Sequence, residues 1–246
     1  IQNTWMDAKI GDIVVTPRNG KAIEINALWY NALKIMESFA NLYKEKELAK
    51  KYAELAKKCK ESFMKKFYNK KRKCFDDLVG DNSIRPNQLF AIGLHYPVVE
   101  PNSVEAKTAF ETVTKKLLTP YGLKTLAKGE KCYREIYEGD QIKRDMSYHQ
   151  GITWPWLLGI YSDSFSNIIN AEKNKTKKKE LEEQYSKFAQ NVENTFYNEM
   201  YNRSTVGSIS ELYDSAKPYE AKGAFAQAWS VAEVFRIIEK RNKWES

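Results

Sequence analysis

Residues 22–43 read AIEINALWYNALKIMESFANLY, and this stretch decides the fold class. Apolar side chains recur at helical spacing on nearly every face of it, whereas a surface helix keeps one polar face. The next helical segment, 47–68, carries a single apolar stripe at Leu48, Tyr52, Leu55, Cys59, Phe63 and Phe67. We therefore expect the first helix to be buried and the second helix to cover it.

The same alternation of a buried and a covering helix recurs along the chain. Residues 86–94 and 151–169 are apolar all round, and 224–240 close the chain in the same way. The segment 103–118 carries one stripe at Ala106, Phe110, Val113 and Leu117, and the segment 177–200 carries one at Leu181, Tyr185, Phe188, Val192 and Phe196. The stretch KCFDDLVGDNSI, residues 73–84, is expected to add a minor hairpin.

Alternating buried and covering helices are typical of an α/α toroid, a double ring whose inner helices touch protein on both sides. A four-helix bundle or a superhelical repeat array is the alternative. Each bundle helix would keep one polar face, however, and no fixed sequence period is visible. We therefore expect an all-α chain in which residues 1–246 belong to a single toroid domain.

Composition leaves several classes of partner open and disfavours others. Aromatic residues make up 13% of the 246 residues, and sugar faces, exposed bases and plain packing can all use such rings. The net charge is +8, but most basic residues are lysines on solvent faces of helices, and Arg18, Arg85 and Arg144 stand in loops. No apolar run approaches the roughly 20 residues that a membrane span needs. We expect neither a nucleic-acid nor a membrane partner.

The cysteines and histidines favour a cytoplasmic protein without a metal. Cys59, Cys74 and Cys132 are odd in number and show no CxxC spacing, which is typical of reduced thiols. His95 and His149 are too few for a His-rich metal site. We expect no metal and no other cofactor.

Each expected buried helix follows a loop that carries polar and aromatic residues. If the inner helices run parallel, these four loops open at one end of the toroid and form a shared mouth. The candidate residues at that mouth are Trp5, Asp7, Arg18, Glu24, Arg85, Gln88, Arg144, Asp145, His149, Gln150, Trp154, Glu211 and Gln227.

A pocket of carboxylates, amides and rings, without a metal cluster or a phosphate loop, fits carbohydrate. Hydrolysis of a glycosidic bond needs two carboxyl groups, one as acid and one as base or nucleophile. Asp7 and Glu211 stand in loops among glycine, serine and aromatic neighbours, where one of them can be partly buried. A carbohydrate-binding or scaffold toroid without catalysis needs only the rings and the hydroxyl partners, and stays the alternative.

Six motifs, in order, resemble one known family. They are TWMDAKIGD, TPRNGKAIEINALWYNAL, SIRPNQ, LLTPYGLKTL, YHQGITWPWLLG and AQAWSVAE. The chain resembles the C-terminal amylo-α-1,6-glucosidase domain of bacterial and archaeal glycogen debranching enzymes, an (α/α)6 toroid similar to glucoamylase and one of the six-hairpin glycosidases. The resemblance implies that Asp7 is the acid and Glu211 the base in hydrolysis of α-1,6-linked glucose with inversion. The implied substrates are glycogen, limit dextrin or malto-oligosaccharide.

The chain departs from this family in its number of helices. A complete toroid has twelve helices, and about seven are recognisable here. The chain therefore resembles a C-terminal fragment that lacks the first five helices. We expect the fragment alone to be a poor catalyst and to expose an apolar flank where those helices should pack.

Several of the candidate residues have a structural explanation as well as a functional one. Trp29, Trp156 and Trp229 lie on buried helices and are expected in the core, whereas Trp5 and Trp154 begin helices at the mouth and are expected to contact sugar.

The charged and polar candidates are equally open. Arg144 and Asp145 either pair with each other to hold a loop or bind glucose hydroxyls. His149 is either a hydrogen-bonded residue at a helix start or a ligand contact, and Glu24 could simply favour the dipole of the helix that it begins.

Overall fold

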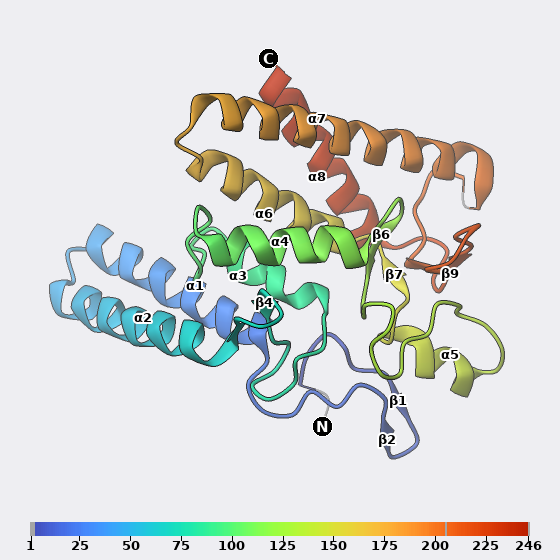
Figure 1. The fold of residues 1–246 in the computed structure, drawn as a ribbon, viewed down its shortest axis with the longest axis horizontal. Helices are drawn as coiled ribbons and strands as arrows, with labels where there is room; N and C mark the ends of the chain where they lie inside the picture. Colours follow the sequence, from blue (N-terminus) through green and yellow to red (C-terminus); the bar gives the residue numbers. More distant parts are fainter. Residues whose placement is uncertain (1–2, 205, 246) are drawn as a thin grey trace.

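The computed structural model describes residues 3–204 and 206–245, and most of them are helical (Figure 1). The helices are α1 (Ile23–Leu42), α2 (Lys46–Phe67), α3 (Phe90–Gly93), α4 (Val104–Leu117), α5 (Gln141–Tyr148), α6 (Leu157–Ala171), α7 (Lys175–Asn198) and α8 (Ala228–Glu245), with a 3-10 turn η1 (Pro86–Leu89) before α3 and a π turn η2 (Glu199–Arg203) after α7. Over the described residues, no helix is both long enough and apolar enough to cross a membrane.

The helices form an inner and an outer row. In the inner row α1 contacts α3, α3 contacts α6, and α6 contacts α8. In the outer row α2 packs on α1, α4 packs on η1 and α6, and α7 packs on α6 and α8 (Figure 1). The alternation of inner and outer helices along the chain therefore follows the order that the sequence predicted.

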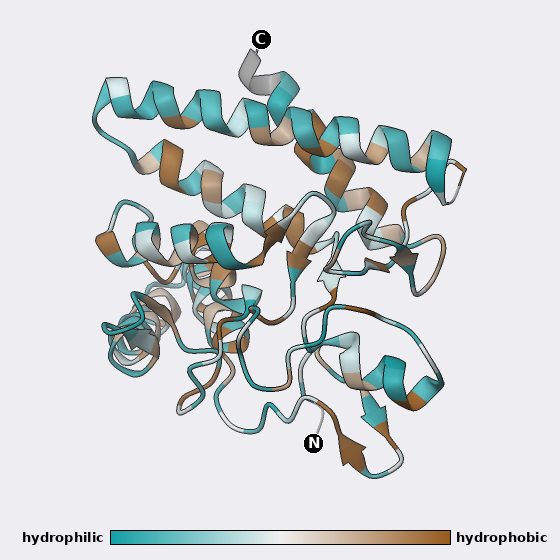
Figure 2. Cartoon of the chain, turned by 45° about the vertical axis from the view of Figure 1, so that its right-hand side comes forward, coloured by the Kyte–Doolittle hydropathy of each residue, from teal (hydrophilic) through white to brown (hydrophobic). Residues whose placement is uncertain are grey.

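The predicted stripes of α4 and α7 are confirmed. Ala106, Phe110, Val113 and Leu117 of α4 are all buried. On α7 the side chains of Tyr185, Val192 and Phe196 are buried, and Leu181 and Phe188 are half-buried against the core. The rest of α7 is mainly hydrophilic (Figure 2). α6 lies beneath both helices and buries most of its side chains, as expected for an inner helix.

Side-chain caps fix the starts of three helices. The Ser103 Oγ accepts from Ala106 N at 3.1 Å at the start of α4, and Asn174 Oδ1 accepts from Lys177 N at 3.0 Å at the start of α7. Asp140 caps α5 in the same way. The stretch GDQIKRDMSYHQGITW, residues 139–154, is expected as a loop, and α5 is an additional short helix within it.

The two end helices of the inner row, α1 and α8, were predicted to be buried on all faces, and each has an exposed apolar face instead. The side chain of Trp29, expected in the core, is 56% exposed, and that of Phe235 on α8 is 62% exposed. The other exposed apolar residues are Ile25, Leu28, Met36, Phe39 and Leu42 on α1 and Trp229 and Val231 on α8. The reason is geometric, because each of these helices has an inner neighbour on one side only within the described chain.

The stripe of α2 is displaced from its expected position. Leu48 and Leu55 are exposed, and the alanines next to them, Ala49 and Ala56, are buried instead. The small alanine side chains lie in the seam with α1, while Phe63 near the end of α2 is buried as predicted.

The expectation of an all-α chain is wrong in one respect, because short strands pair between the helices. The strands are β1 (Lys9–Ile10), β2 (Ile13–Val14), β3 (Tyr68–Asn69), β4 (Cys74–Phe75), β5 (Leu118–Thr119), β6 (Gly122–Lys124), β7 (Thr153–Trp154), β8 (Leu212–Tyr213) and β9 (Ala221–Lys222). β3 and β4 form a hairpin that lies earlier than the expected one, since only β4 falls within residues 73–84. β5 to β9 form one antiparallel sheet in sequence order, and strands this short show no alternating pattern in the sequence.

The central strands of this sheet come very close together at a glycine. Gly122 of β6 has φ +149, and a Cβ there would lie 2.3 Å from the carbonyl oxygen of Trp154 on β7. Only glycine fits this position, which lets β6 and β7 lie this close together.

Candidate active site

The loops ahead of the inner helices meet in a cluster of aromatic rings. The indole of Trp5 lies edge-on to the rings of His149, Trp154 and Trp156, with centroids 5.2, 5.7 and 5.0 Å apart. The ring of Trp229, at the start of α8, stacks on that of Trp156 at 4.9 Å. The N-terminal loop, the segment after α5 and the start of α8 are therefore side by side.

Glu211 lies in this region, directly before β8, and its half-buried carboxylate is held from two sides. Oε1 accepts a short hydrogen bond from Tyr148 Oη, and Oε2 accepts one from Ala224 N at 2.9 Å. A polar cavity of about 680 Å³ opens beside the carboxylate, lined by Tyr137, Glu138, Gly139, Arg144, Lys222, Gly223 and Ala224.

Tyr148 contacts one of the two candidate carboxylates, that of Glu211. Burial raises the pKa of Tyr148, and the hydrogen bond to Glu211 and the negative charges of Glu211 and Asp7 raise it further. The phenol therefore stays protonated and donates a hydrogen bond throughout the physiological pH range. Asp7 is exposed in the N-terminal loop, and its negative charge is the smallest of these causes.

Arg18 and Glu24 form a buried ion cluster beneath the loops. Arg18 donates from Nη1 and Nη2 to both oxygens of Glu24, and from Nε to Asp77 Oδ2 at 2.7 Å. Burial by itself lowers the pKa of Arg18, but the hydrogen bonds and charges of Glu24 and Asp77 outweigh it and raise the pKa above its usual value. With Arg18 4% and Glu24 2% exposed, these groups bind each other inside the protein.

Arg85 joins three segments from a buried position. Its Nη1 donates to the carbonyl oxygens of Thr125 at 3.0 Å and His149 at 2.7 Å, and its Nη2 donates to Gln150 Oε1 at 2.9 Å. Gln88 Nε2 donates to the Arg85 carbonyl oxygen at 3.0 Å. Burial lowers the pKa of Arg85. The polar atoms of this group hold the loops together.

His149 is a neutral, buried ring. It is 1% exposed, and its imidazole stacks on the indole of Trp154 with centroids 5.4 Å apart. Burial lowers the pKa of His149 to about 3, with help from the positive charges of Arg85 and Arg18. Trp154, which is 2% exposed, donates from Nε1 to the Tyr148 carbonyl oxygen at 3.0 Å and so fixes the backbone next to the phenol.

The other candidates lie nearer the surface. Arg144 is exposed and lines the polar cavity, and Asp145 is half-buried. Over the described residues these two side chains form no ion pair with each other. Gln227 is half-buried directly before α8, where its backbone N donates to the carbonyl oxygen of Ile209 at 2.9 Å.

The sequence interpretation missed Asp77, Asn87 and Tyr148. Asn87 accepts at Oδ1 from Trp5 Nε1 at 2.8 Å and donates from Nδ2 to Asp77 Oδ1 at 2.8 Å, which ties the N-terminal loop to the buried ion cluster. Asn87 and Tyr148 stood inside the motifs SIRPNQ and YHQGITWPWLLG. Asp77 stood in the stretch assigned to a minor hairpin, where its spacing gave no indication of a role.

Groups that could bind a metal are not assembled in the described part of the chain. There, no three or more His, Cys, Asp or Glu side chains are arranged to hold a metal ion. Cys59, Cys74 and Cys132 are free thiols, half-buried, buried and exposed respectively.

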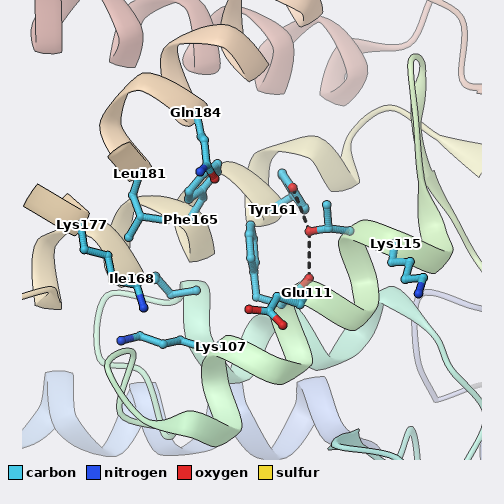
Figure 3. Close-up of a pocket in the computed structure, with 11 residues that line it drawn as sticks. Lys107, Glu111, Lys115, Tyr161, Phe165, Ile168, Lys177, Leu181 and Gln184 are labelled. Atoms are coloured by element: carbon cyan, nitrogen blue, oxygen red, sulfur yellow. Dashed lines mark hydrogen bonds between the residues drawn. The ribbon is translucent and has the colours of Figure 1, made fainter. Parts of the chain in front are cut away.

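A second cavity, of about 420 Å³, lies between the outer helices α4 and α7, over α6 (Figure 3). Its apolar surface comes from residues such as Tyr161, Phe165 and Leu181, and lysines stand around its edge. It is bounded by helices, and none of the candidate residues of the mouth lines it. The two cavities therefore belong to different parts of the fold.

Comparison with known proteins gives a consistent picture. A family model described as Amylo-alpha-1,6-glucosidase matches residues 1–236. The glycogen debranching enzyme of Saccharomyces cerevisiae is 27% identical over 213 residues, which cover 67% of this chain and 14% of the yeast protein.

Two solved structures share the fold. A sialidase superposes with a TM-score of 0.69 at 17% identity, covering 92% of this chain and 20% of the sialidase chain. A Glycoside Hydrolase Family 15 glucoamylase from Hypocrea jecorina superposes with a TM-score of 0.54 at 15% identity, covering 98% of this chain and 45% of the glucoamylase chain. This chain thus spans less than half the length of each of these relatives.

Proposed function

This chain belongs to the amylo-alpha-1,6-glucosidase family, and we propose that it carries the catalytic pair of a debranching glycoside hydrolase. The substrate is an α-1,6-linked glucose at a branch point of glycogen or limit dextrin, and glucose is released with inversion at the anomeric carbon. A non-catalytic carbohydrate-binding toroid remains the alternative. Free thiols and the glycogen-type substrate favour a cytoplasmic location.

One observation supports the catalytic pair above all. Glu211 accepts a hydrogen bond from Tyr148 beside a polar cavity, and the negative charge of Asp7, far away in the sequence, helps to raise the pKa of the same tyrosine. A glycosidase needs two carboxyl groups that face one bond, and inversion needs about 6.5 to 9.5 Å between them to admit a water. The polar cavity of about 680 Å³ beside Glu211 has room for both a sugar ring and that water.

The proposed reaction balances its protons between the two carboxyl groups. Asp7 gives its proton to the bridging oxygen, so that the rest of the glucan leaves as an alcohol. Glu211 takes a proton from the water that attacks the anomeric carbon from the opposite face. Tyr148 keeps its proton throughout, because its raised pKa makes the phenol a donor and not a base.

Burial separates the other candidates into residues that can contact a sugar and residues that hold the loops. Trp5, Arg144 and Asp145 are half-buried or exposed, and we assign them to the sugar. The buried candidates bond to or stack on neighbouring side chains and backbone, and we assign them to the floor that holds the loops. They are Arg18, Glu24, Arg85, Gln88, His149, Gln150 and Trp154. Gln227, half-buried before α8, is assigned to the rim.

The complete pocket needs more helices than these residues supply. We propose that the inner and outer rows are part of an (α/α)6 toroid, and that further helices of the natural protein cover the exposed apolar faces of α1 and α8. The coverage of only 45% of the glucoamylase chain supports this proposal.

The test of the substrate uses the natural gene product that contains these residues. It is offered a malto-oligosaccharide with one α-1,6-linked glucose stub and, in parallel, the linear oligosaccharide of equal length. The expected result is release of glucose from the branched compound only. Binding of both compounds without glucose release would instead support the carbohydrate-binding module.

A further inference from the structure

The backbone opposite Glu211 has an unusual shape. The pair Leu212 and Lys222 is in register between β8 and β9, and one step beyond it Gly223 stands opposite Glu211. Gly223 has φ +71, and a Cβ there would lie 2.4 Å from Glu211 Oε2 and 3.1 Å from Glu211 Cβ. The space taken by the carboxylate exists only because this residue has no side chain.

We propose that Tyr148 and Gly223 are positioning residues for the Glu211 carboxylate. This inference rests on the proposed role of Glu211 as the base. The Tyr148 hydroxyl fixes Oε1, and the bare α-carbon of Gly223 lets Oε2 reach the backbone N–H of Ala224 at 2.9 Å.

The two contacts together fix one orientation of the carboxylate. A glutamate side chain has three rotatable bonds, and a single hydrogen bond leaves it free to swing about that bond. Bonds to both oxygens from different elements, α5 and the turn after β9, remove this freedom. Each oxygen keeps a lone pair that can accept a proton from water. The base is thereby held in place before the substrate arrives, which is how enzymes lower the cost of orientation.

Tyr148 is itself rigid, which a positioning residue must be. Its ring lies 4.9 Å from that of Trp154, and its carbonyl oxygen accepts from Trp154 Nε1 at 3.0 Å. Tyr137 flanks its ring on another side at 5.7 Å. The hydroxyl is therefore held in one position beside Glu211.

The test compares two pairs of matched variants in the natural gene product. Tyr148→Phe removes a hydroxyl bonded to Glu211, and Tyr161→Phe removes one bonded to Thr114 on the far side of the fold at 3.0 Å. Gly223→Ala adds a methyl group against Glu211, and Gly207→Ala adds one at a similar φ, +76, with nothing within 4 Å. The kcat, the KM, the pH profile of kcat and the thermal unfolding of each variant are measured on the branched substrate.

The expected result separates positioning from stability. Tyr148→Phe and Gly223→Ala lower kcat about tenfold to a hundredfold while KM changes by less than about threefold. In Tyr148→Phe the acid limb of the profile also moves to higher pH, because the ionised base has lost a donor. The two control variants change thermal unfolding but leave kcat and the profile in place.

Two outcomes would overturn the inference, and they can be told apart. If Tyr148→Phe keeps the kcat and the pH profile of Tyr161→Phe while Glu211→Gln is inactive, Tyr148 has no positioning role. If Glu211→Gln is as active as the wild type, the proposed function fails and this inference fails with it. Should Gly223→Ala not fold, the Tyr148→Phe profile decides.

Discussion

The indole rings of Trp156 and Trp229 stack with centroids 4.9 Å apart and planes inclined by 15°. They join the start of α6 to the start of α8 at the mouth, and Trp229 is 38% exposed. An aromatic pair contributes about 0.5 to 1.5 kcal/mol beyond the area that it buries. The stack therefore holds the starts of α6 and α8 together, and part of Trp229 stays exposed to solvent.

Removing the Trp156–Trp229 stack should lower the free energy of unfolding measurably. We expect Trp229→Ala to lower the free energy of unfolding by about 1 to 3 kcal/mol, because both the stacking and part of the buried area are lost. Phe235→Ala, on the exposed face of the same helix, should change it by less than about 0.5 kcal/mol in the isolated chain. Urea unfolding measures both, and equal effects would show that the stack does not join the helices.

The buried ion cluster should behave as part of the framework. Arg18→Leu leaves the buried carboxylate of Glu24 without its cation and that of Asp77 with only the more distant Arg85 Nε at 3.7 Å, so we expect a loss of about 3 to 5 kcal/mol in the free energy of unfolding. The matched control is Lys128→Met, which breaks the exposed pair with Glu135 and should cost less than about 1 kcal/mol. A stable Arg18→Leu protein that has lost only affinity for sugar would return Arg18 to the sugar-binding set.

His149 predicts a specific loss of stability in acid. Its pKa is about 3 in the fold, below the usual value of 6.5, so the unfolded chain takes up a proton between these values and the folded chain does not. The contribution of His149 is therefore complete above pH 6.5 and declines as the pH falls toward 3. At pH 5 it should lower the free energy of unfolding by about 2 kcal/mol relative to pH 7.

The measurement is the difference in pH dependence between the wild type and His149→Gln, which cancels the carboxylate groups common to both. The His95→Gln variant, altered at an exposed histidine, should keep the wild-type dependence. The prediction fails if His149→Gln and the wild type lose stability in parallel from pH 7 to pH 5.

The exposed faces of α1 and α8 predict how the isolated chain behaves. Phe39 is 51% and Phe235 is 62% exposed, within apolar faces that we propose to be covered in the natural protein. We expect the isolated chain to self-associate, and the double variant Phe39→Gln/Phe235→Gln to be more nearly monomeric in sedimentation. In the natural gene product the same double variant should be destabilising. A monodisperse, fully active isolated chain would contradict the proposed cover.

The sequence predicted the buried faces of α4 and α7 well and that of α2 only in part. The stripes of α4 and α7 place Phe110 and Tyr185 in the core because their periodicity reports burial on one side. An all-round apolar pattern, as in α1, indicates that every face of the helix packs against protein. It does not show which face lacks a neighbour in this chain, so Trp29 was expected in the core although it is exposed. Strands of two or three residues, such as β7 and β8, carry too few positions for any period to show.

The sequence placed the candidate residues in the loops before the inner helices, but it did not show how deeply each one is buried. The loops that carry Asp7 and Glu211 could be found from their motifs, and Glu211 accepts a hydrogen bond from Tyr148, which stands in another of these motifs. The catalytic roles of Asp7 and Glu211 stay a prediction. Whether a polar side chain faces a sugar or another side chain depends on partners far away in sequence. Arg18 meets Asp77 across 59 residues, and no local pattern reports that contact.

The most direct test of the central claim follows the product of the catalytic pair. Asp7→Asn and Glu211→Gln are made in the natural gene product, and glucose release from a branched limit dextrin is recorded together with its anomer by NMR. General acid and general base catalysis each contribute about a hundredfold to ten-thousandfold, so we predict losses of that size in kcat with binding retained. Inversion predicts β-glucose as the first product of the wild type. Near wild-type rates in both variants would contradict the assignment of Asp7 and Glu211, and α-glucose as the first product would contradict inversion.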